Sequence, residues 1–197
     1  MARTKSFDPE EKLADAMNLF WRKGFNATSL EDLERELKLK RFSIYNAFGD
    51  KLQLYRDALQ LYISTVFEPA IKGLSETGGL DSIQGFFEGC LDFYATQPQR
   101  LGCFICNSSI ELGFSDDKVS RLTADAHEQL QKAFFNALMI EKQRGGLSDA
   151  VDLDSASRFL VTLYRGLVTS NCIEITTSWM DAYKDQLDLL TTTWRKL

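Results

Sequence analysis

The stretch that decides the fold is Thr28–Lys51, TSLEDLERELKLKRFSIYNAFGDK. It predicts two short helices joined by a tight, basic corner. Thr28 and Glu31 fit a capping box, in which a hydroxyl and a carboxylate satisfy free N–H groups at a helix start. The first helix then has one apolar face, because three leucines recur at helical spacing, Leu30, Leu33 and Leu37.

The second helix begins beside a cluster of cations. Lys40 and Arg41 stand at its start, and Ser43–Phe48 continues it. A helix N-terminus carries about half a positive charge, so cations there are mildly unfavourable in the free protein. The arrangement makes sense when an anion arrives from outside, and the obvious polyanion is the DNA backbone. A short polar helix displayed beside cations suits the major groove, so the stretch predicts a DNA-binding helix-turn-helix.

The residues expected to face DNA come from this stretch. We expect Thr28 and Lys51 to hold phosphates, and the Tyr45 hydroxyl is able to do the same. Arg41, Ser43 and Asn46 are candidates for base edges, since Arg pairs with guanine and Asn with adenine. The complete predicted set is Thr28, Ser29, Lys40, Arg41, Ser43, Tyr45, Asn46 and Lys51.

Two alternatives stay open here. The cations could form only a solvated basic face, and Phe42 could touch a thymine methyl group or merely pack against protein. If a dimer neutralises about 6–8 phosphates, log affinity should fall with log salt at a slope near −6 to −7.

The same residues carry a family resemblance. Ala27–Leu30 and Leu37–Lys51 resemble the N-terminal domain of TetR/AcrR-type transcriptional repressors, and the match extends over about residues 8–60. The ending Tyr–x–x–Phe–x–x–Lys is a specific part of that pattern. Four residues depart from the usual Gly, Ser, Gly or Pro, and His of the family: Lys38, Lys40, Phe42 and Ala47. The departures leave the predicted fold in place but prevent the transfer of any known operator sequence.

Composition is that of an ordinary globular protein. The 197 residues are 44% hydrophobic and 26% charged, with a formal net charge of −5. Residues 1–55 carry ten Lys/Arg against nine Asp/Glu, whereas the rest carry thirteen against nineteen. Positive charge is therefore local to the predicted head, and the acidic remainder limits non-specific association.

Several classes of protein are excluded. No apolar run reaches the roughly eighteen residues of a membrane span, and the N-terminus has no hydrophobic segment for a signal peptide. Four cysteines in a chain of this length do not indicate a secreted disulfide scaffold. We therefore expect a cytoplasmic protein.

The rest of the chain predicts an all-α fold of about nine helices. Asp8-Pro9 starts the first helix and Gly24 ends it. We expect a DNA-binding domain at 1–50, a linking helix over about 51–68, and an effector-binding and dimerisation domain at 51–197. Residues 1–7 read as a basic arm or a frayed end, and 71–80 as a flexible corner. Further helices are expected at 81–94, 102–113, 116–144, 157–170 and 178–194, with a β-leaning patch at 173–177.

The last two helices carry apolar residues on more than one side, including Trp179, Met180 and Leu189. A partner subunit is the expected place to bury them. In the resembling family this pair forms a four-helix bundle with its mate, which implies a homodimer. Two recognition helices would then address half-sites one helical turn or more apart.

Cys103 and Cys106 form a C-x-x-C pair. A thioredoxin-like motif would need a βαβ setting, and a zinc site would need more ligands. Three readings stay open for this pair: small core residues, a thiol or electrophile sensor, and a metal site. His127 is the only histidine, and we expect it at a helix surface or a pocket rim. No catalytic set is visible, so we predict neither an enzyme nor a bound cofactor.

The resemblance implies a small-molecule effector. Some aromatic side chains of the body would line its cavity while most pack in the core, and the candidates are Phe87, Tyr94, Phe104, Phe134 and Tyr164. The leading hypothesis is a homodimeric repressor on a near-palindromic operator, released by an apolar or aromatic effector that shifts the fourth helix. The rivals are a regulator switched through Cys103 or Cys106, and a helical enzyme or binding protein that does not use its head.

Overall fold

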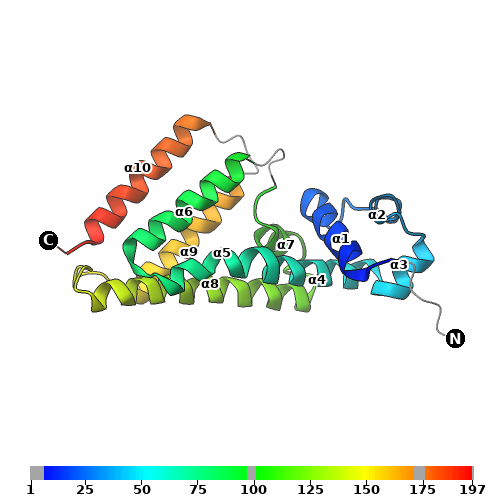
Figure 1. Cartoon of the computed structure of the whole chain (residues 1–197), viewed down its shortest axis with the longest axis horizontal. Helices are drawn as coiled ribbons and strands as arrows, with labels where there is room; N and C mark the ends of the chain where they lie inside the picture. Colours follow the sequence, from blue (N-terminus) through cyan, green and yellow to red (C-terminus); the bar gives the residue numbers. More distant parts are fainter. Residues whose placement is uncertain (1–6, 97–100, 171–175, 197) are drawn as a thin grey trace.

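The computed structural model describes residues 7–96, 101–170 and 176–196. They form an elongated, all-helical molecule in which the described N-terminal helices make one end and the C-terminal helix lies near the other (Figure 1). The helices are α1 Pro9–Lys23, α2 Leu30–Leu37, α3 Arg41–Phe48, α4 Lys51–Tyr62, η1 Ile63–Phe67, α5 Glu68–Glu76, α6 Gly79–Thr96, α7 Phe104–Leu112, α8 Asp117–Gln143, α9 Leu153–Ser170 and α10 Thr177–Trp194. Because α4, η1 and α5 run on without a break, the described residues make nine helical segments, as the sequence predicted.

The first helix has the predicted ends. The Asp8 carboxylate accepts a hydrogen bond from the N–H of Glu10, and Gly24 ends α1 with a φ of 76°. α1 then packs along α4, which makes the helix-turn-helix continuous with the body. Trp21 and Phe25 are half-buried and pack against the core.

The capping box of α2 lies one residue later than predicted. Ser29 and Asp32 form it, each side chain bonding the backbone N–H of the other residue. Thr28 is fully buried instead, and its hydroxyl donates to the Gly24 carbonyl at 2.6 Å. The Thr28–Glu31 prediction was therefore wrong, because Thr28 is used to close the end of α1.

A π-helical turn interrupts the fourth helix. The Glu68 N–H reaches back five residues to the Ile63 carbonyl. Pro69 has no N–H to donate, and the Ser64 and Thr65 hydroxyls both donate to the Leu61 carbonyl, at 3.1 and 2.7 Å. These features explain locally why the regular hydrogen-bond ladder gives way at η1.

The corner predicted for residues 71–80 is much shorter in the structure. Helix α5 continues to Glu76 and packs on α8, so only the turn at Thr77–Gly78 separates it from α6. Gly78 has a φ of 61°, and an added Cβ would lie 2.4 Å from Ile140. The glycine pair therefore serves a tight turn against α8 and not a flexible linker.

The body is built around α8, the longest helix, as predicted. It contacts α5, α6, α7 and α9, and Asp116 caps its start by accepting from the Val119 N–H at 2.8 Å. Helix α9 begins at Leu153, four residues before the predicted start. The described residues include no helix long and apolar enough to cross a membrane.

Some sequence predictions fall on residues that are not described. They are residues 1–6 of the segment expected as a basic arm or a frayed end, and most of the β-leaning patch at 173–177. Thr176 and Thr177, at the end of that patch, are described and form the cap and first residue of α10.

Candidate functional site

One face of α3 is turned to solvent. Arg41, Phe42, Tyr45 and Asn46 are exposed and stand at i, i+1, i+4 and i+5, which places them on one side of the helix. Ile44 is 2% exposed and anchors the opposite side. α3 therefore presents two cationic or polar residues and two aromatic ones on a single outward strip.

The start of α3 keeps its cations in water. Lys40 is the N-cap residue with no side-chain capping bond, and both Lys40 and Arg41 are exposed. The Glu34 carboxylate of α2 accepts from the Arg41 backbone N–H at 2.8 Å, a contact the sequence did not suggest. One of the donors at this helix start is thus satisfied within the chain, while the two cationic side chains are exposed to any anion that approaches from solvent.

Arg41 is positioned by its neighbour one turn along. Its Nε and one terminal nitrogen donate to the Tyr45 hydroxyl at 3.3 and 3.2 Å, and its guanidinium carbon lies 5.4 Å from the centre of that ring. The contact restricts the rotamers of both side chains. Less conformational entropy is then lost when Arg41 engages a base or phosphate.

The remaining predicted DNA-facing residues differ in access. Ser29 is exposed but its hydroxyl donates to Asp32, and Ser43 is half-buried. Thr28 has no exposed surface, so its hydroxyl does not reach the protein surface and the predicted phosphate contact is not supported.

Lys51 lies at the first position of α4. Its ammonium is 4.3 Å from the centre of the Phe25 ring. Burial lowers the pKa of Lys51, against the opposing charges of Glu111 and Asp32. The lysine thus sits where the end of α1, α4 and α7 meet, half-buried beside the helix-turn-helix.

Lys38 ends α2 in a strained conformation. Its φ of 54° and ψ of 36° are left-handed, and it is the only non-glycine residue with positive φ in the described part of the chain. Side chains with a Cβ are disfavoured there, which explains why the resembling family usually has glycine at this point.

Helix α7 ties the body directly to the helix-turn-helix. The Glu111 carboxylate accepts from the backbone N–H groups of Phe25 and Asn26, at 2.8 and 2.7 Å. The Trp21 indole N–H donates to the Gly102 carbonyl at 2.9 Å, just before α7. No local signal in the sequence indicated these contacts, because the partners lie more than eighty residues apart.

A second link joins α4 to α8. The Arg56 guanidinium pairs with both oxygens of the Asp116 carboxylate, with Nε 3.1 Å from one of them. The hydrogen bond from Arg56 lowers the pKa of Asp116, which also caps α8. A change in the tilt of α4 would therefore shift Arg56 relative to Asp116 and disturb the cap of α8, the longest helix.

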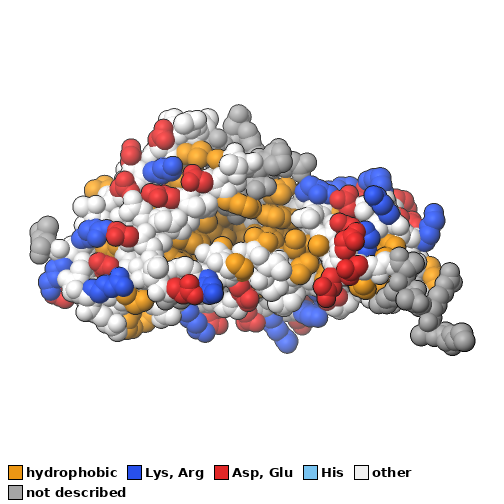
Figure 2. Space-filling model, viewed as in Figure 1, with side chains coloured by type: hydrophobic (Ala, Val, Ile, Leu, Met, Phe, Trp, Pro, Cys, Tyr) orange, Lys and Arg blue, Asp and Glu red, His pale blue; other side chains and the backbone are white. Residues whose placement is uncertain are grey.

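An apolar groove of about 580 Å³ lies between the α4–η1–α5 helix and α6. Figure 2 shows hydrophobic side chains gathered in the hollow between these helices. None of its lining residues is acidic, basic or histidine; they are Tyr62, Thr65, Val66, Phe67, Pro69, Ala70, Ile71, Gly85, Phe86, Gly89, Cys90, Phe93 and Tyr164. The volume suits a drug-sized molecule, and the lining favours a neutral, apolar or aromatic one.

The aromatic residues predicted for a cavity are mostly core. Phe87, Phe104 and Phe134 have no exposed surface, and Phe87 stacks on Phe134 with ring centres 5.7 Å apart. Of the five candidates, Tyr164 lines the groove, and the side chain of Tyr94 is outside the described part. The rest of the lining comes from the end of α4, the π-turn, α5 and α6, and includes two glycines of α6 that hydrophobic periodicity does not single out.

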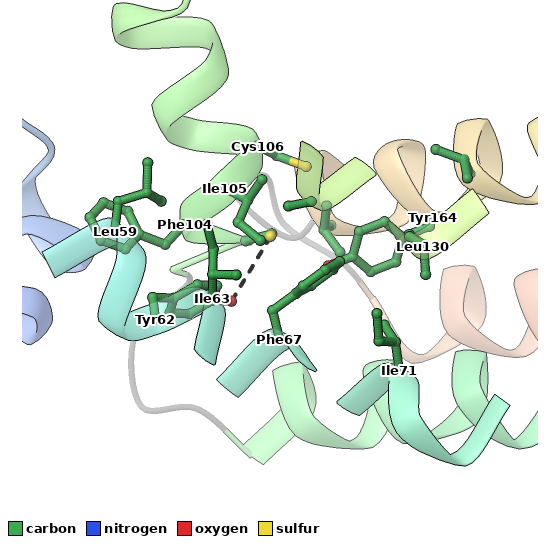
Figure 3. Close-up of a cluster of buried hydrophobic side chains, with 14 of the residues drawn as sticks. Leu59, Tyr62, Ile63, Phe67, Ile71, Phe104, Ile105, Cys106, Leu130 and Tyr164 are labelled. Atoms are coloured by element: carbon green, nitrogen blue, oxygen red, sulfur yellow. Dashed lines mark hydrogen bonds between the residues drawn. The ribbon is translucent and has the colours of Figure 1, made fainter. Parts of the chain in front are cut away.

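The cysteine pair lies in the core beside this groove (Figure 3). Cys103 occupies the N-cap position of α7 without a side-chain capping bond, and its sulfur accepts from the Tyr62 hydroxyl at 3.9 Å. The Cys106 thiol is 3.6 Å from His127 Nε2. Burial raises the pKa of Cys103, but hydrogen bonds from Cys106, Tyr164 and the backbone at the start of α7 outweigh it and lower the pKa. Burial lowers the pKa of His127 to about 4, assisted by the charge of Arg165.

These contacts revise the reading of His127. It is a half-buried residue with a thiol partner, and it is neutral near pH 7. Within the described residues no cluster of three metal-ligating side chains occurs. Burial raises the pKa of the third described cysteine, Cys90, to about 12, so that thiol stays protonated.

The outer side of α9 and α10 is unusually apolar. Helix α10 buries only Leu187 and Thr191 among its 18 residues. Phe159 is 49% exposed and Leu189 59% exposed, beside a hollow of about 340 Å³ between the two helices. The Tyr183 hydroxyl, which lines this hollow, is buried without a hydrogen-bond partner among the described residues.

Comparison with known proteins agrees with this arrangement. Residues 13–58 match the family model described as "Bacterial regulatory proteins, tetR family". Residues 79–187 match the one described as "Tetracyclin repressor-like, C-terminal domain". The two matches together include α2, α3, the α6 and α9 side of the groove, and the hollow between α9 and α10 except its last residues.

Individual relatives span nearly the whole chain. The uncharacterised HTH-type transcriptional regulator YezE of Bacillus subtilis (strain 168) is 27% identical over 191 residues, covering 96% of this chain and 97% of the relative. The HTH-type transcriptional repressor ComR of Escherichia coli (strain K12) is 25% identical over 170 residues, covering 85% and 81%. A cysteine mutant of the regulator CifR, solved with 26-base-pair operator DNA, superposes with a TM-score of 0.83 at 19% identity, over 98% of this chain and 100% of that one.

Proposed function

Because the chain belongs to the TetR family of transcriptional regulators, we propose that it is a homodimeric repressor that a neutral, apolar or aromatic effector releases from a near-palindromic operator. Members of this family are DNA-binding regulators and not enzymes. The observation that carries the proposal is the outward face of α3, where exposed Arg41, Tyr45 and Asn46 stand beside exposed Lys40. The protein would act in the cytoplasm, where operator DNA lies.

In this proposal DNA binding and effector binding belong to the two domains predicted from the sequence. Residues 1–50 form the DNA-binding head and 51–197 the effector-binding and dimerisation body. Lys40 and Lys51 meet phosphates, while Arg41 and Asn46 reach base edges in the major groove. The Arg41–Tyr45 contact supports this role, because a preorganised guanidinium loses less entropy on binding.

The mate of the dimer would cover α9 and α10. This is supported by the exposed Phe159 and Leu189 and by the hollow between the helices. A second copy of the chain would bury this apolar surface in a symmetric contact. Sedimentation of Leu189→Glu against the exposed control Ile110→Glu tests it. We expect Leu189→Glu to sediment as a monomer and Ile110→Glu to sediment as a dimer. The same sedimenting mass for both variants would reject this interface.

The effector would bind in the groove between η1, α5 and α6. The π-turn supports this assignment, because the same continuous helix lines the groove and carries α4 to the head. A ligand shifts the equilibrium only through unequal affinity for the DNA-binding and released forms. A coupling of about 1–3 kcal/mol is typical of such systems.

Selection of genomic fragments by the purified full chain tests the core of the proposal. We expect recovery of a near-palindromic site, bound with a slope of log affinity on log salt near −6 to −7. Recovery of fragments without a shared sequence, or binding that is insensitive to salt, would contradict it.

The alternative function is a thiol switch at Cys103 and Cys106. It is supported by the contact of Cys106 with His127, whose neutral ring can accept the thiol proton, and by the lowered pKa of Cys103. Operator binding after hydrogen peroxide treatment separates the two functions. If the pair is a switch, peroxide should release the wild type and Cys90→Ser from the operator, whereas Cys103→Ser/Cys106→Ser should stay bound. Equal responses of all three proteins to peroxide would exclude the switch.

A further inference from the structure

The most unusual side chain on the outward face of α3 is an exposed phenylalanine. Phe42 is 76% exposed, although most large apolar side chains of the chain lie in the core. It is the second residue of the eight-residue α3, on the side of that helix opposite the buried Ile44. The second of the two sequence-based alternatives for Phe42, packing against protein, therefore does not describe it in this subunit, because most of its surface is open to solvent.

The surroundings of Phe42 indicate what approaches it. Lys40 and Arg41 precede it, and Asn46 follows one helical turn later on the same face. A ring flanked in this way comes close to any duplex that Lys40 and Arg41 contact. Phe42 and Asn46 then face that duplex from the same side of α3.

A phenyl ring has few favourable partners in the major groove. It has no donor or acceptor for a phosphate or for the polar edge of a base. The apolar group that the major groove offers is the C5-methyl group of thymine. Resting on the proposed function, we infer that Phe42 is a specificity-determining residue that reads a thymine methyl group in each operator half-site.

The spacing on the helix limits where this thymine lies. Residues at i and i+4 are about 5–6 Å apart at Cβ, and successive base pairs are about 3.4 Å apart. If Asn46 pairs with an adenine, the thymine read by Phe42 falls within about two base pairs of it. The half-site thus contains an A·T pair whose thymine is recognised by its methyl group.

Replacement of thymine by deoxyuridine tests this directly, because it removes the methyl group and keeps every hydrogen-bonding group. The duplex is the one selected from genomic fragments, substituted one thymine at a time and titrated by fluorescence anisotropy. For the wild type, we expect one thymine in each half-site whose replacement weakens binding about fourfold, the value of one buried methyl group. Phe42→Ala should bind the unmodified duplex at least as weakly as the wild type binds the uracil-substituted duplex. Its affinity should not differ between thymine and uracil at that position.

Phe114→Ala is the matched control, because Phe114 is fully exposed and lies outside α3. It should keep the wild-type difference between thymine and uracil. If wild type and Phe42→Ala lose affinity equally at every uracil, the inference is overturned while operator binding stands. If the wild type selects no duplex at all, both the inference and the proposed function fail.

Discussion

The Glu111 carboxylate on α7 lies 2.8 Å from the backbone nitrogen of Phe25, and its second oxygen lies 2.7 Å from that of Asn26. One acidic side chain of the body therefore satisfies two N–H groups in the turn after α1. Hydrogen bonds to charged groups contribute about 1.5–3 kcal/mol each when they are shielded from water. This contact fixes the head on the body independently of α4.

Glu111→Ala should lower the free energy of unfolding by about 2–3 kcal/mol, since it leaves two backbone donors without an acceptor. Glu111→Gln should cost less, because its amide oxygen still accepts one bond. Urea denaturation measures both. The control is Glu128→Ala, which removes an exposed acid paired with Lys132 and should change stability by no more than about 0.5 kcal/mol. An equal effect of Glu111→Ala and Glu128→Ala would show that the contact contributes nothing.

Lys38→Gly should stabilise the protein by about 0.5–1 kcal/mol, because glycine adopts the left-handed conformation without a Cβ penalty. Lys38→Ala removes the same charge but keeps a Cβ, so it should give no such gain. Thermal unfolding of the two variants distinguishes them. Equal melting temperatures would mean that the backbone strain at this turn is negligible.

Stability should fall as the pH drops from about 6.5 to about 4. Burial lowers the pKa of His127 to about 4 in the folded state, whereas the unfolded value is near 6.5. Between these values the unfolded chain binds a proton that the folded chain does not, so acid favours unfolding. His127→Gln should flatten this part of the curve of urea midpoint against pH. Parallel curves for wild type and variant would contradict the assignment.

Gly89→Leu should block the groove without disturbing the fold. Nothing lies within 4 Å of a Cβ added at Gly89, and leucine is the better helix former by nearly 1 kcal/mol. We expect the neutral dye N-phenyl-1-naphthylamine to bind the wild type and to bind Gly89→Leu at least tenfold more weakly. Gly73→Leu, equally open but outside the groove, should bind the dye like the wild type. Unchanged dye binding by Gly89→Leu would place the apolar site elsewhere.

The fold was largely predictable because its signals are local. Asp8 caps α1 and Gly24 ends it, both where the sequence indicated. The capping box was misplaced because Thr28–Glu31 and Ser29–Asp32 both fit the pattern in the same five residues. Only the three-dimensional structure shows that the Thr28 hydroxyl is already bonded to Gly24.

The candidate sites divide in the same way. The exposed cations of α3 were predictable, since they are contiguous in sequence. Cys106 and His127 meet across α7 and α8, and Glu111 meets Phe25 across two domains of the predicted fold. Such contacts leave no periodic signal in one sequence. Periodicity likewise marks the apolar faces of helices, but it does not show whether a given side chain packs against neighbours or lines an open groove. Phe87 packs in the core, whereas Tyr164 lines the groove.

The most direct measurement is the salt dependence of operator binding by Lys40→Ala/Arg41→Ala, compared with Lys132→Ala/Lys142→Ala, which removes the same charge from exposed positions of α8. In a dimer the first variant loses two phosphate contacts, from Lys40, and two base contacts, from Arg41. We expect it to bind much more weakly at low salt and to have a slope of log affinity on log salt shallower by about 2. The α8 variant should keep the wild-type slope. Wild-type affinity and slope for Lys40→Ala/Arg41→Ala would contradict the account.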